Sequence, residues 1–460
     1  TDLSLHQYRV PEGSAPLRKP GDLDPPMNVR TGTPRPDRAR LAGCRRWGAL
    51  GLAALVVAAG TITSRASWAD ASAPPLTLGH VLSRVAAVHP QMQRARAEVE
   101  VSRQQLDGAR WGRFPSVTIG AAGGEGVSKA GTFRLQQPVY TFGRTEYAVD
   151  AAQASLDATT SGIGVARRSL IERAALAHAR WLAGLQQVEL AERHVARQRE
   201  LLEFIARRAD GGMAARGDTR LAQGRLDQAR ARAAALGATV SQALAELESL
   251  MLTRILARPV PPELPGLAFP GVESLATAIV DASPALERLT GQQRAASAEA
   301  SLKGADRLPM LVARVERSPN LLTSHYDTRT MLAMDYQSGA GLSAQSEYLA
   351  RLGRVDALRA EIDAQRRELE LLAGSLWLQR AALLEQGAAI EGLVASSADT
   401  VESFMRQFDA GRRSWLDVLN AERELFDARL AKAQIDAGLR EVEIRVHAGI
   451  GTLDTLAMKP

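Results

Sequence analysis

The stretch QFDAGRRSWLDVLNAERELFDARLAKAQ, residues 407–434, has a counterpart earlier in the chain, RADGGMAARGDTRLAQGRLDQARARAAA, residues 208–235. In both stretches glycine interrupts a sequence that otherwise favours helix, and several residues recur at one constant offset. These pairs are Gly212 with Gly411, Asp218 with Asp417, Leu226 with Leu425 and Ala229 with Ala428. Because glycine commonly ends a helix, each stretch predicts the turn of a helical hairpin, which we call a tip.

The duplication extends over most of the chain. Pro90 and Pro115 bracket one predicted helix, and Pro284 and Pro309 bracket its copy, since proline suits a first helical turn and also ends helices. Alternating patterns then predict two β-hairpins, one with strands at 116–124 and 132–140 around a loop at 125–130, the other with strands at 310–317 and 329–337. A glycine and a long helix follow each hairpin. The order helix, two strands, long helix, tip, helix therefore occurs twice.

The first long helix is expected to run from about Arg144 to Asp210, because that stretch contains no proline. At 1.5 Å per residue it would be about 100 Å long. Small and apolar residues recur along it with the spacing of a coiled-coil seam. They are Leu170, Ala174, Ala177, Trp181, Gly184, Val188, Ala191, Val195 and Leu202.

These patterns divide the chain into five parts. They are an N-terminal extension with a signal peptide (1–69), a first repeat (70–256), a Pro-rich linker (257–273), a second repeat (274–456) and a short tail (457–460). The fold class that this predicts is mainly α with a small β part.

The first part has the pattern of a secretory leader. Basic residues such as Arg45 and Arg46 precede the apolar run WGALGLAALVVAAGTI, residues 47–62, and small residues precede Asp70. This pattern predicts a signal peptide that is cleaved after about Ala69, the alternative being an uncleaved anchor. After residue 70 no apolar run is long enough to span a bilayer as a helix.

The single cysteine, Cys44, ends the sequence LAGC, which resembles a lipid-attachment box. Such a box should follow the apolar run, whereas this one precedes it, so we expect no lipid on Cys44. The mature chain would then contain no cysteine and no disulfide.

Charge and motif content argue against several functions. The net charge is +6, but residues 1–69 hold 10 Lys/Arg and 5 Asp/Glu, so nearly all of the excess belongs to the leader and not to a nucleic-acid surface. The seven histidines show no metal-ligand spacing, and no Ser–His–Asp grouping is evident. We therefore expect no metal, no cofactor, no nucleic acid and no enzymatic activity.

In its order of elements and in several motifs, the chain resembles the TolC-type outer-membrane factor family. The matching pieces are LQQPVYTFGR (135–144), GMAARGDTRLAQGRLDQA (212–229) and FDAGRRSWLDVLNAERELFDARLAKAQ (408–434). The resemblance implies a homotrimer whose long helices form a periplasmic α-barrel and whose four strands per subunit build a twelve-stranded outer-membrane β-barrel. Independently, four strands cannot close a barrel, and lipid tolerates no open sheet edge.

The resemblance also implies roles for the tips. In the family an aspartate of the second tip lines the narrow periplasmic entrance, and Asp417 matches it. Asn420 replaces a second such aspartate, which should weaken cation selectivity. Family members lock the entrance with an arginine and a tyrosine of the second tip that hold an aspartate of the first. Arg413 and Asp218 match two of these residues, while Phe408 replaces the tyrosine and lacks its hydroxyl group.

The remaining tip residues are expected to form the turns and to dock a periplasmic adaptor. They are Gly211, Gly212, Met213, Gly411 and Arg412. The alternative for Asp417, Asp218 and Arg413 is that charged residues near a helix start only cap the helix.

The implied function is the outer-membrane exit duct of a tripartite export system. The expected partners are a periplasmic adaptor (a membrane fusion protein), an inner-membrane ABC transporter, an exported protein and outer-membrane lipid. We favour type I secretion of a protein toxin. Small-molecule or multidrug efflux is the alternative, and a soluble coiled-coil scaffold is the rival from another class.

Overall fold

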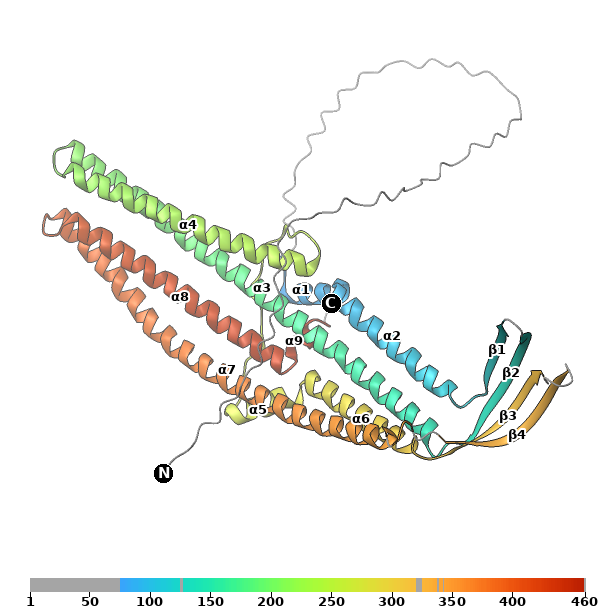
Figure 1. Ribbon diagram of the computed structural model, residues 1–460. Coiled ribbons are helices and arrows are strands. Elements are labelled where there is room, and N and C mark those ends of the chain that lie inside the picture. The colour runs from blue at the N-terminus through green and yellow to red at the C-terminus, as the bar shows by residue number, and fades with distance from the viewer. Residues whose placement is uncertain (1–74, 125–126, 320–324, 337–338, 342, 459–460) are drawn as a thin grey trace, which may run out of the picture. The chain divides into compact units, whose positions relative to one another are not determined.

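The two halves of the chain contain the same succession of elements (Figure 1). The computed structural model describes residues 75–458 except 125–126, 320–324, 337–338 and 342, so the predicted leader and Cys44 lie outside the described residues. The first half comprises α1 (Leu78–Val88), α2 (Pro90–Trp111), β1 (Ser116–Gly124), β2 (Val127–Tyr140), α3 (Arg144–Asp210) and α4 (Arg216–Met251). The second comprises α5 (Val272–Asp281), α6 (Pro284–Ala305), β3 (Met310–Pro319), β4 (Tyr326–Asp335), α7 (Ser343–Asp409), α8 (Trp415–Gly449) and α9 (Thr452–Leu456).

The predicted helices form where the prolines and glycines place them. α2 and α6 both begin at a proline, and each is capped by the preceding side chain: His89 Nδ1 accepts from the Gln91 amide at 3.2 Å, and Ser283 Oγ accepts from the Leu286 amide at 3.4 Å. α3 and α7 each contain 67 residues. The predicted bounds of the first long helix are therefore confirmed, and its copy has the same length.

The main core surrounds the middle of α3. From Leu170 to Gly184 this helix is buried on nearly all sides, because α1, α4 and α9 pack around it. The predicted seam lies in this contact: Trp181 is 5% exposed and Ala177 is fully buried. Val188 and Val195, farther along, are only half-buried. Small residues allow the helices to approach closely, since a Cβ at Gly184 would lie 2.8 Å from Val240 of α4.

A second core packs α5 against α7 and α8. The segment predicted as a linker contributes to both cores: Leu264 packs against the first, and Leu267 and Phe269 pack against the second. α5 itself begins at Val272, inside the predicted linker. The Pro-rich composition of residues 257–273 therefore reflects an extended segment that is packed onto the helices.

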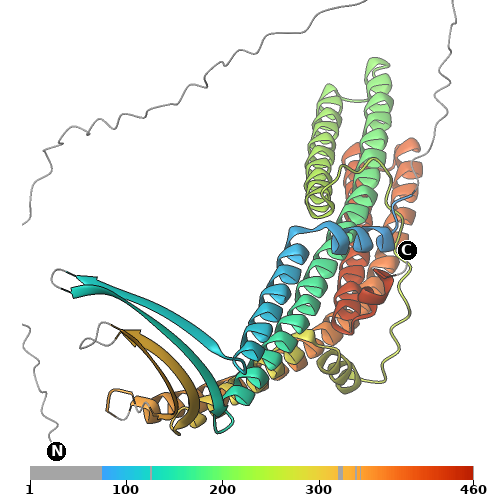
Figure 2. The ribbon, with the colours of Figure 1, turned by 90° about the vertical axis from the view of Figure 1, so that its right-hand side faces the viewer.

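The strands form one antiparallel sheet in the order β1-β2-β3-β4, which lies beyond the ends of the helices (Figures 1 and 2). β2 begins at Val127, so most of the predicted loop at 125–130 is strand, and β2 is 14 residues long. Ala130 and Gly131 gave no strand signal in the sequence, but backbone pairing with β1 continues through them. Within the described residues, β1 and β4 each have a strand on one side only.

No helix in the described part of the chain combines the length and the apolar character that a membrane crossing requires.

Candidate functional site

The two tips have the same backbone structure. We call residues 211–215 the first tip and residues 410–414 the second. Gly212 and Gly411 both have φ +71°, and the next amide bonds back to a carbonyl of the preceding helix at 2.8 Å in each tip. A Cβ at either glycine would meet nothing within 4 Å. The left-handed backbone, and not crowding, therefore requires glycine at both positions.

The second tip begins its next helix with a capping box. The Asp417 amide donates to Ser414 Oγ at 3.2 Å, and the Ser414 amide donates to Asp417 Oδ2 at 3.4 Å. Arg413 Nη1 lies 3.6 Å from the same carboxylate, and its guanidinium carbon lies 4.1 Å from the Phe404 ring centre. The capping alternative therefore describes the position of Asp417 and Arg413 within one subunit.

The first tip lacks this cap. Ala215 occupies the N-cap position of α4, and no side chain caps the helix there. Asp218 lies in the first turn of α4, half-buried. Among the described residues, no side-chain hydrogen bond or ion pair links Asp218 to Arg413. The pair predicted from the resemblance is therefore absent within one subunit.

A cluster that the sequence did not predict joins the two tips. We call Phe204, Arg208, Phe408 and Trp415 the tip cluster. Trp415 is 3% exposed, and its ring centre lies 5.9 Å from that of Phe204 and 5.1 Å from that of Phe408. The Arg208 guanidinium carbon lies 4.9 Å from the Phe408 ring centre, and Arg208 Nη1 lies 3.9 Å from Asp409 Oδ1.

Phe408 packs in the tip cluster through its ring. Its ring packs between Arg208 and Trp415, in a core that also contains Ile205 of α3 and Val418 of α8. The signal that could have revealed the cluster is the spacing of Phe204, Phe408 and Trp415 near the helix ends. Helical periodicity alone did not show that they meet across two hairpins.

Asn420 links the hairpins in another way. Its Oδ1 accepts a hydrogen bond from Arg225 Nη2 of α4 at 3.3 Å. The other tip residues that we predicted, Gly211, Met213 and Arg412, are exposed.

Several ionisable side chains lie in the contact between the helical hairpins α3–α4 and α7–α8, and a histidine among them is half-buried. His194 of α3 stacks on Phe426 of α8 with ring centres 4.2 Å apart. Burial lowers the pKa of His194 from 6.5 to about 4, although the Asp427 carboxylate opposes this shift. His194 is therefore neutral at physiological pH.

The sheet has two faces of different chemistry. Paired residues on neighbouring strands share a face. The mainly apolar face carries Val117, Ile119, Phe133, Leu135, Ala313, Val315, Leu332 and Met334, and also the polar residues Gln137, Arg317 and Thr330. It is uncovered: Ile119 is 79% exposed and Met334 is 71% exposed. The opposite face carries Thr118, Arg134, Gln136, Arg314, Glu316 and Arg329, with ion pairs from Arg134 to Glu316 at 3.4 Å and from Arg314 to Asp335 at 2.7 Å.

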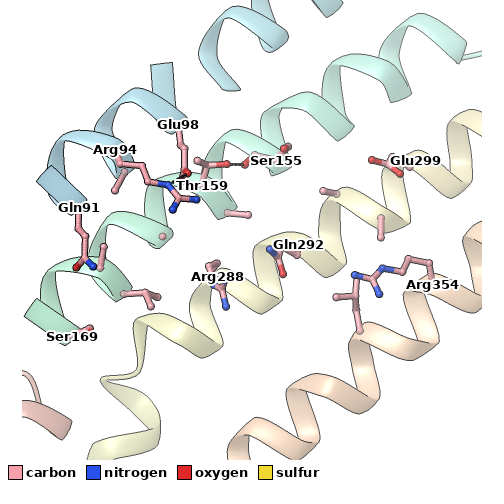
Figure 3. A pocket seen from close by; sticks show the side chains of 18 of the residues that line it. Gln91, Arg94, Glu98, Ser155, Thr159, Ser169, Arg288, Gln292, Glu299 and Arg354 are labelled. Atoms are coloured by element: carbon pink, nitrogen blue, oxygen red, sulfur yellow. Dashed lines mark hydrogen bonds and ion pairs between the residues drawn. The ribbon is translucent and has the colours of Figure 1, made fainter. Parts of the chain in front are cut away.

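A polar groove of about 700 Å³ lies between the sheet and the tips, where α2, α3, α6 and α7 run side by side. Figure 3 shows its lining, in which arginine, glutamate and glutamine side chains alternate with small residues. Within the described residues, no group of histidine, cysteine, aspartate and glutamate side chains could hold a metal ion.

Comparisons with known proteins identify the architecture. Residues 81–251 match the family model described as outer membrane efflux protein. Over 347 residues the chain is 26% identical to the alkaline protease secretion protein AprF of Pseudomonas aeruginosa, covering 70% of each chain.

Solved structures show the same fold. The CusC structures give a TM-score of 0.73 at 17% identity, covering 82% of this chain and 92% of CusC. The outer membrane protein VceC of Vibrio cholerae gives a TM-score of 0.69 at 14% identity, covering 81% and 96%. These matches confirm the predicted TolC-like fold. The family model, the relative and the fold all agree with the resemblance to the outer-membrane factor family.

Proposed function

We propose that three copies of this chain form an exit duct through the outer membrane, with the long helices extending into the periplasm. The observation that carries this proposal is the distribution of side chains on the sheet. A sheet in water buries its apolar face and exposes its polar one. Here the apolar face is bare and the opposite face is charged, which is the arrangement of a barrel with lipid outside and water inside.

The subunit is open on both sides, which supports a closed ring of copies. β1 and β4 each lack one neighbour among the described residues, and lipid does not tolerate free sheet edges. The helices at the two ends of the helical layer also carry exposed apolar residues. Val101 and Trp111 of α2 are 57% and 66% exposed, and Leu371 and Leu378 of α7 are 75% and 70% exposed. α7 of one subunit and α2 of the next would cover these residues.

In this assembly the tips form the periplasmic entrance. Asp417 remains our candidate for an acidic ring there, and Asn420 makes a second ring neutral. Among the described residues Asp218 has no side-chain partner, so the lock between Asp218 and Arg413 is proposed across subunits. The exposed tip residues Met213 and Arg412 are candidates for adaptor docking.

For the cargo, we propose a protein that is exported by type I secretion through an ABC transporter and a periplasmic adaptor. The support is the similarity to AprF, whose name assigns it to secretion of a protease. More specifically, we propose that the exported protein is a toxin such as cyclolysin. Small-molecule efflux is the second candidate, because the matching family model is described by efflux.

The proposal is tested by purifying the full chain from outer membranes. We expect a particle of three subunits in light scattering and discrete conductance steps in planar bilayers. A stable monomer that forms no channels would contradict the proposal. For the cargo, deleting the gene in its native host should remove one abundant protein from the culture medium. Unchanged secretion together with increased drug sensitivity would favour efflux.

A further inference from the structure

The groove shown in Figure 3 is lined by residues of α2, α3, α6 and α7. The four helices follow one another as neighbours, α2 with α3, α3 with α6 and α6 with α7. One groove contacts all four of them, including α2 and α7 at the two ends of the layer. A single space can touch both ends only if the layer bends around it. In a ring of subunits the concave side faces the axis, so the groove lines the duct; this step rests on the proposed function.

The charges of the groove do not balance. Its carboxylates are Glu98 and Glu299, and each is paired: Arg94 Nε lies 2.8 Å from Glu98, and Arg351 Nη1 lies 2.7 Å from Glu299. Two further arginines of the lining have no acidic partner among the described residues. Each subunit therefore contributes an excess of two positive charges to this level of the duct.

These two residues are Arg288 of α6 and Arg354 of α7 (Figure 3). In the described part of the chain neither forms an ion pair, and Arg288 Nε is buried without a hydrogen-bond partner. The Arg288 stem lies over Gly162 of α3, where a Cβ would stand 3.8 Å from Arg288 Cδ. Small residues of α3 and α6, mainly glycine and alanine, form the floor of the groove beneath the two guanidinium groups, and none of these residues is acidic.

We propose that Arg288 and Arg354 form a basic ring inside the duct that attracts anions, and that the cargo segments which pass it are acidic. Three subunits would place six unpaired guanidinium groups around one level of a water-filled passage. A low-dielectric wall focuses such a field and raises the local concentration of oppositely charged solutes. The charge at this level is opposite to that of the acidic ring proposed at Asp417. The passage would therefore select by charge at two successive points.

The test is the reversal potential of single channels in a KCl gradient. The double variant Arg288→Gln with Arg354→Gln should lower the ratio of chloride to potassium permeability by about two- to fivefold. A matched control, Arg294→Gln with Arg366→Gln, removes two arginines of the same helices that lie outside the groove and are exposed. It should leave the ratio unchanged. Arg288→Lys with Arg354→Lys keeps the charge and should also keep the ratio.

A second measurement addresses the cargo. At low salt, a polyglutamate peptide should block the wild-type channel several times more often than the groove double variant, and a polylysine peptide should show the opposite order. Channels whose ratio and blockade are the same in wild type, groove variant and control would overturn the inference while leaving the duct intact. A preparation that forms no channels would instead overturn the proposed function.

Discussion

The two tips share one turn but differ in the residues that follow it. At the constant offset, Arg216 of the first tip region corresponds to Trp415 of the second, and Ala215 corresponds to Ser414. Arg216 is exposed, whereas Trp415 is 3% exposed and joins the core between the hairpins. The glycine sets the backbone of the turn, but the two neighbouring residues decide whether the tip is anchored. The helix that follows the second tip begins with a buried tryptophan and a capping box, whereas the helix that follows the first tip begins with an exposed arginine and no side-chain cap.

The largest expected effect comes from removing this anchor. Trp415→Ala should destabilise the contact between the tips by about 3–5 kcal/mol, because it leaves a cavity among Phe204, Phe408 and Val418. Arg216→Ala at the equivalent position should change stability by less than about 0.5 kcal/mol. Hydrogen exchange of the last turns of α3 and α7 measures both. Equal protection in the two variants would show that Trp415 does not anchor the second tip.

Acid should weaken the packing between the helical hairpins α3–α4 and α7–α8. The pKa of His194 is about 4 in the folded chain and 6.5 in the unfolded chain. The folded chain therefore binds fewer protons, so this stabilisation is fully present above pH 6.5 and is lost as pH falls through about 4. We expect a loss of about 1–3 kcal/mol in the opening free energy of α8 over this window.

The matched variant for this prediction is His194→Phe, which keeps a ring on Phe426 and removes the ionisation. Hydrogen exchange of α8 at pH 7 and pH 4.5 compares the two proteins. Several other histidines, such as His178 and His447, also have lowered pKa values because they are buried, so only the difference between wild type and variant reports on His194. An identical pH dependence in both proteins would contradict the assignment.

The sequence was sufficient for the architecture because its signals are local. Pro90 and Pro284 start helices, Gly212 and Gly411 turn the chain, and a stretch without proline predicts α3 to its last residue. The resemblance added the assembly that these signals alone could not supply. Less local features were missed, such as the continuation of β2 through residues 127–131, which depends on its partner β1.

The candidate site was predicted less completely, since its contacts cross between hairpins. The sequence placed Arg413 in the second tip and Asp417 just after it, but it left open whether they cap a helix or face a partner. The structure shows the cap. Arg208, which lies beside Phe408, carried no signal of its own, because an arginine near a helix end is usually solvated. The groove arginines Arg288 and Arg354 were missed because an arginine on a helix surface is usually solvated.

A smaller effect is expected from exchanging the caps. Ser414→Ala should destabilise the start of α8 by about 1 kcal/mol, because the Asp417 amide loses its acceptor. Ala215→Ser should stabilise the start of α4 by up to about 1 kcal/mol. Asp218 already occupies the third helical position, at which a capping box has its acidic residue. Hydrogen exchange of the first turns measures both. If Ala215→Ser brings no gain, the difference between the tips is not a matter of capping.

The smallest free-energy change should have the most visible functional result, and it distinguishes the two arginines near the tips. Arg208 of the first helical hairpin contacts Phe408 and Asp409 of the second, whereas Arg413 contacts Asp417 of its own hairpin. A half-exposed ion pair contributes only about 0–1 kcal/mol, but three copies would bias one opening equilibrium together. A summed bias of about 1–3 kcal/mol changes the open fraction roughly five- to a hundredfold.

Arg208→Gln should therefore raise single-channel conductance. Arg413→Ser should do so only if Arg413 also pairs with Asp218 of a neighbouring subunit, and a double-mutant cycle of Arg413→Ser with Asp218→Ala measures that coupling. Additive effects in this cycle would leave Arg208 as the residue that holds the entrance closed. Unchanged conductance in Arg208→Gln, with a strong coupling in the cycle, would assign the lock to the contact between subunits.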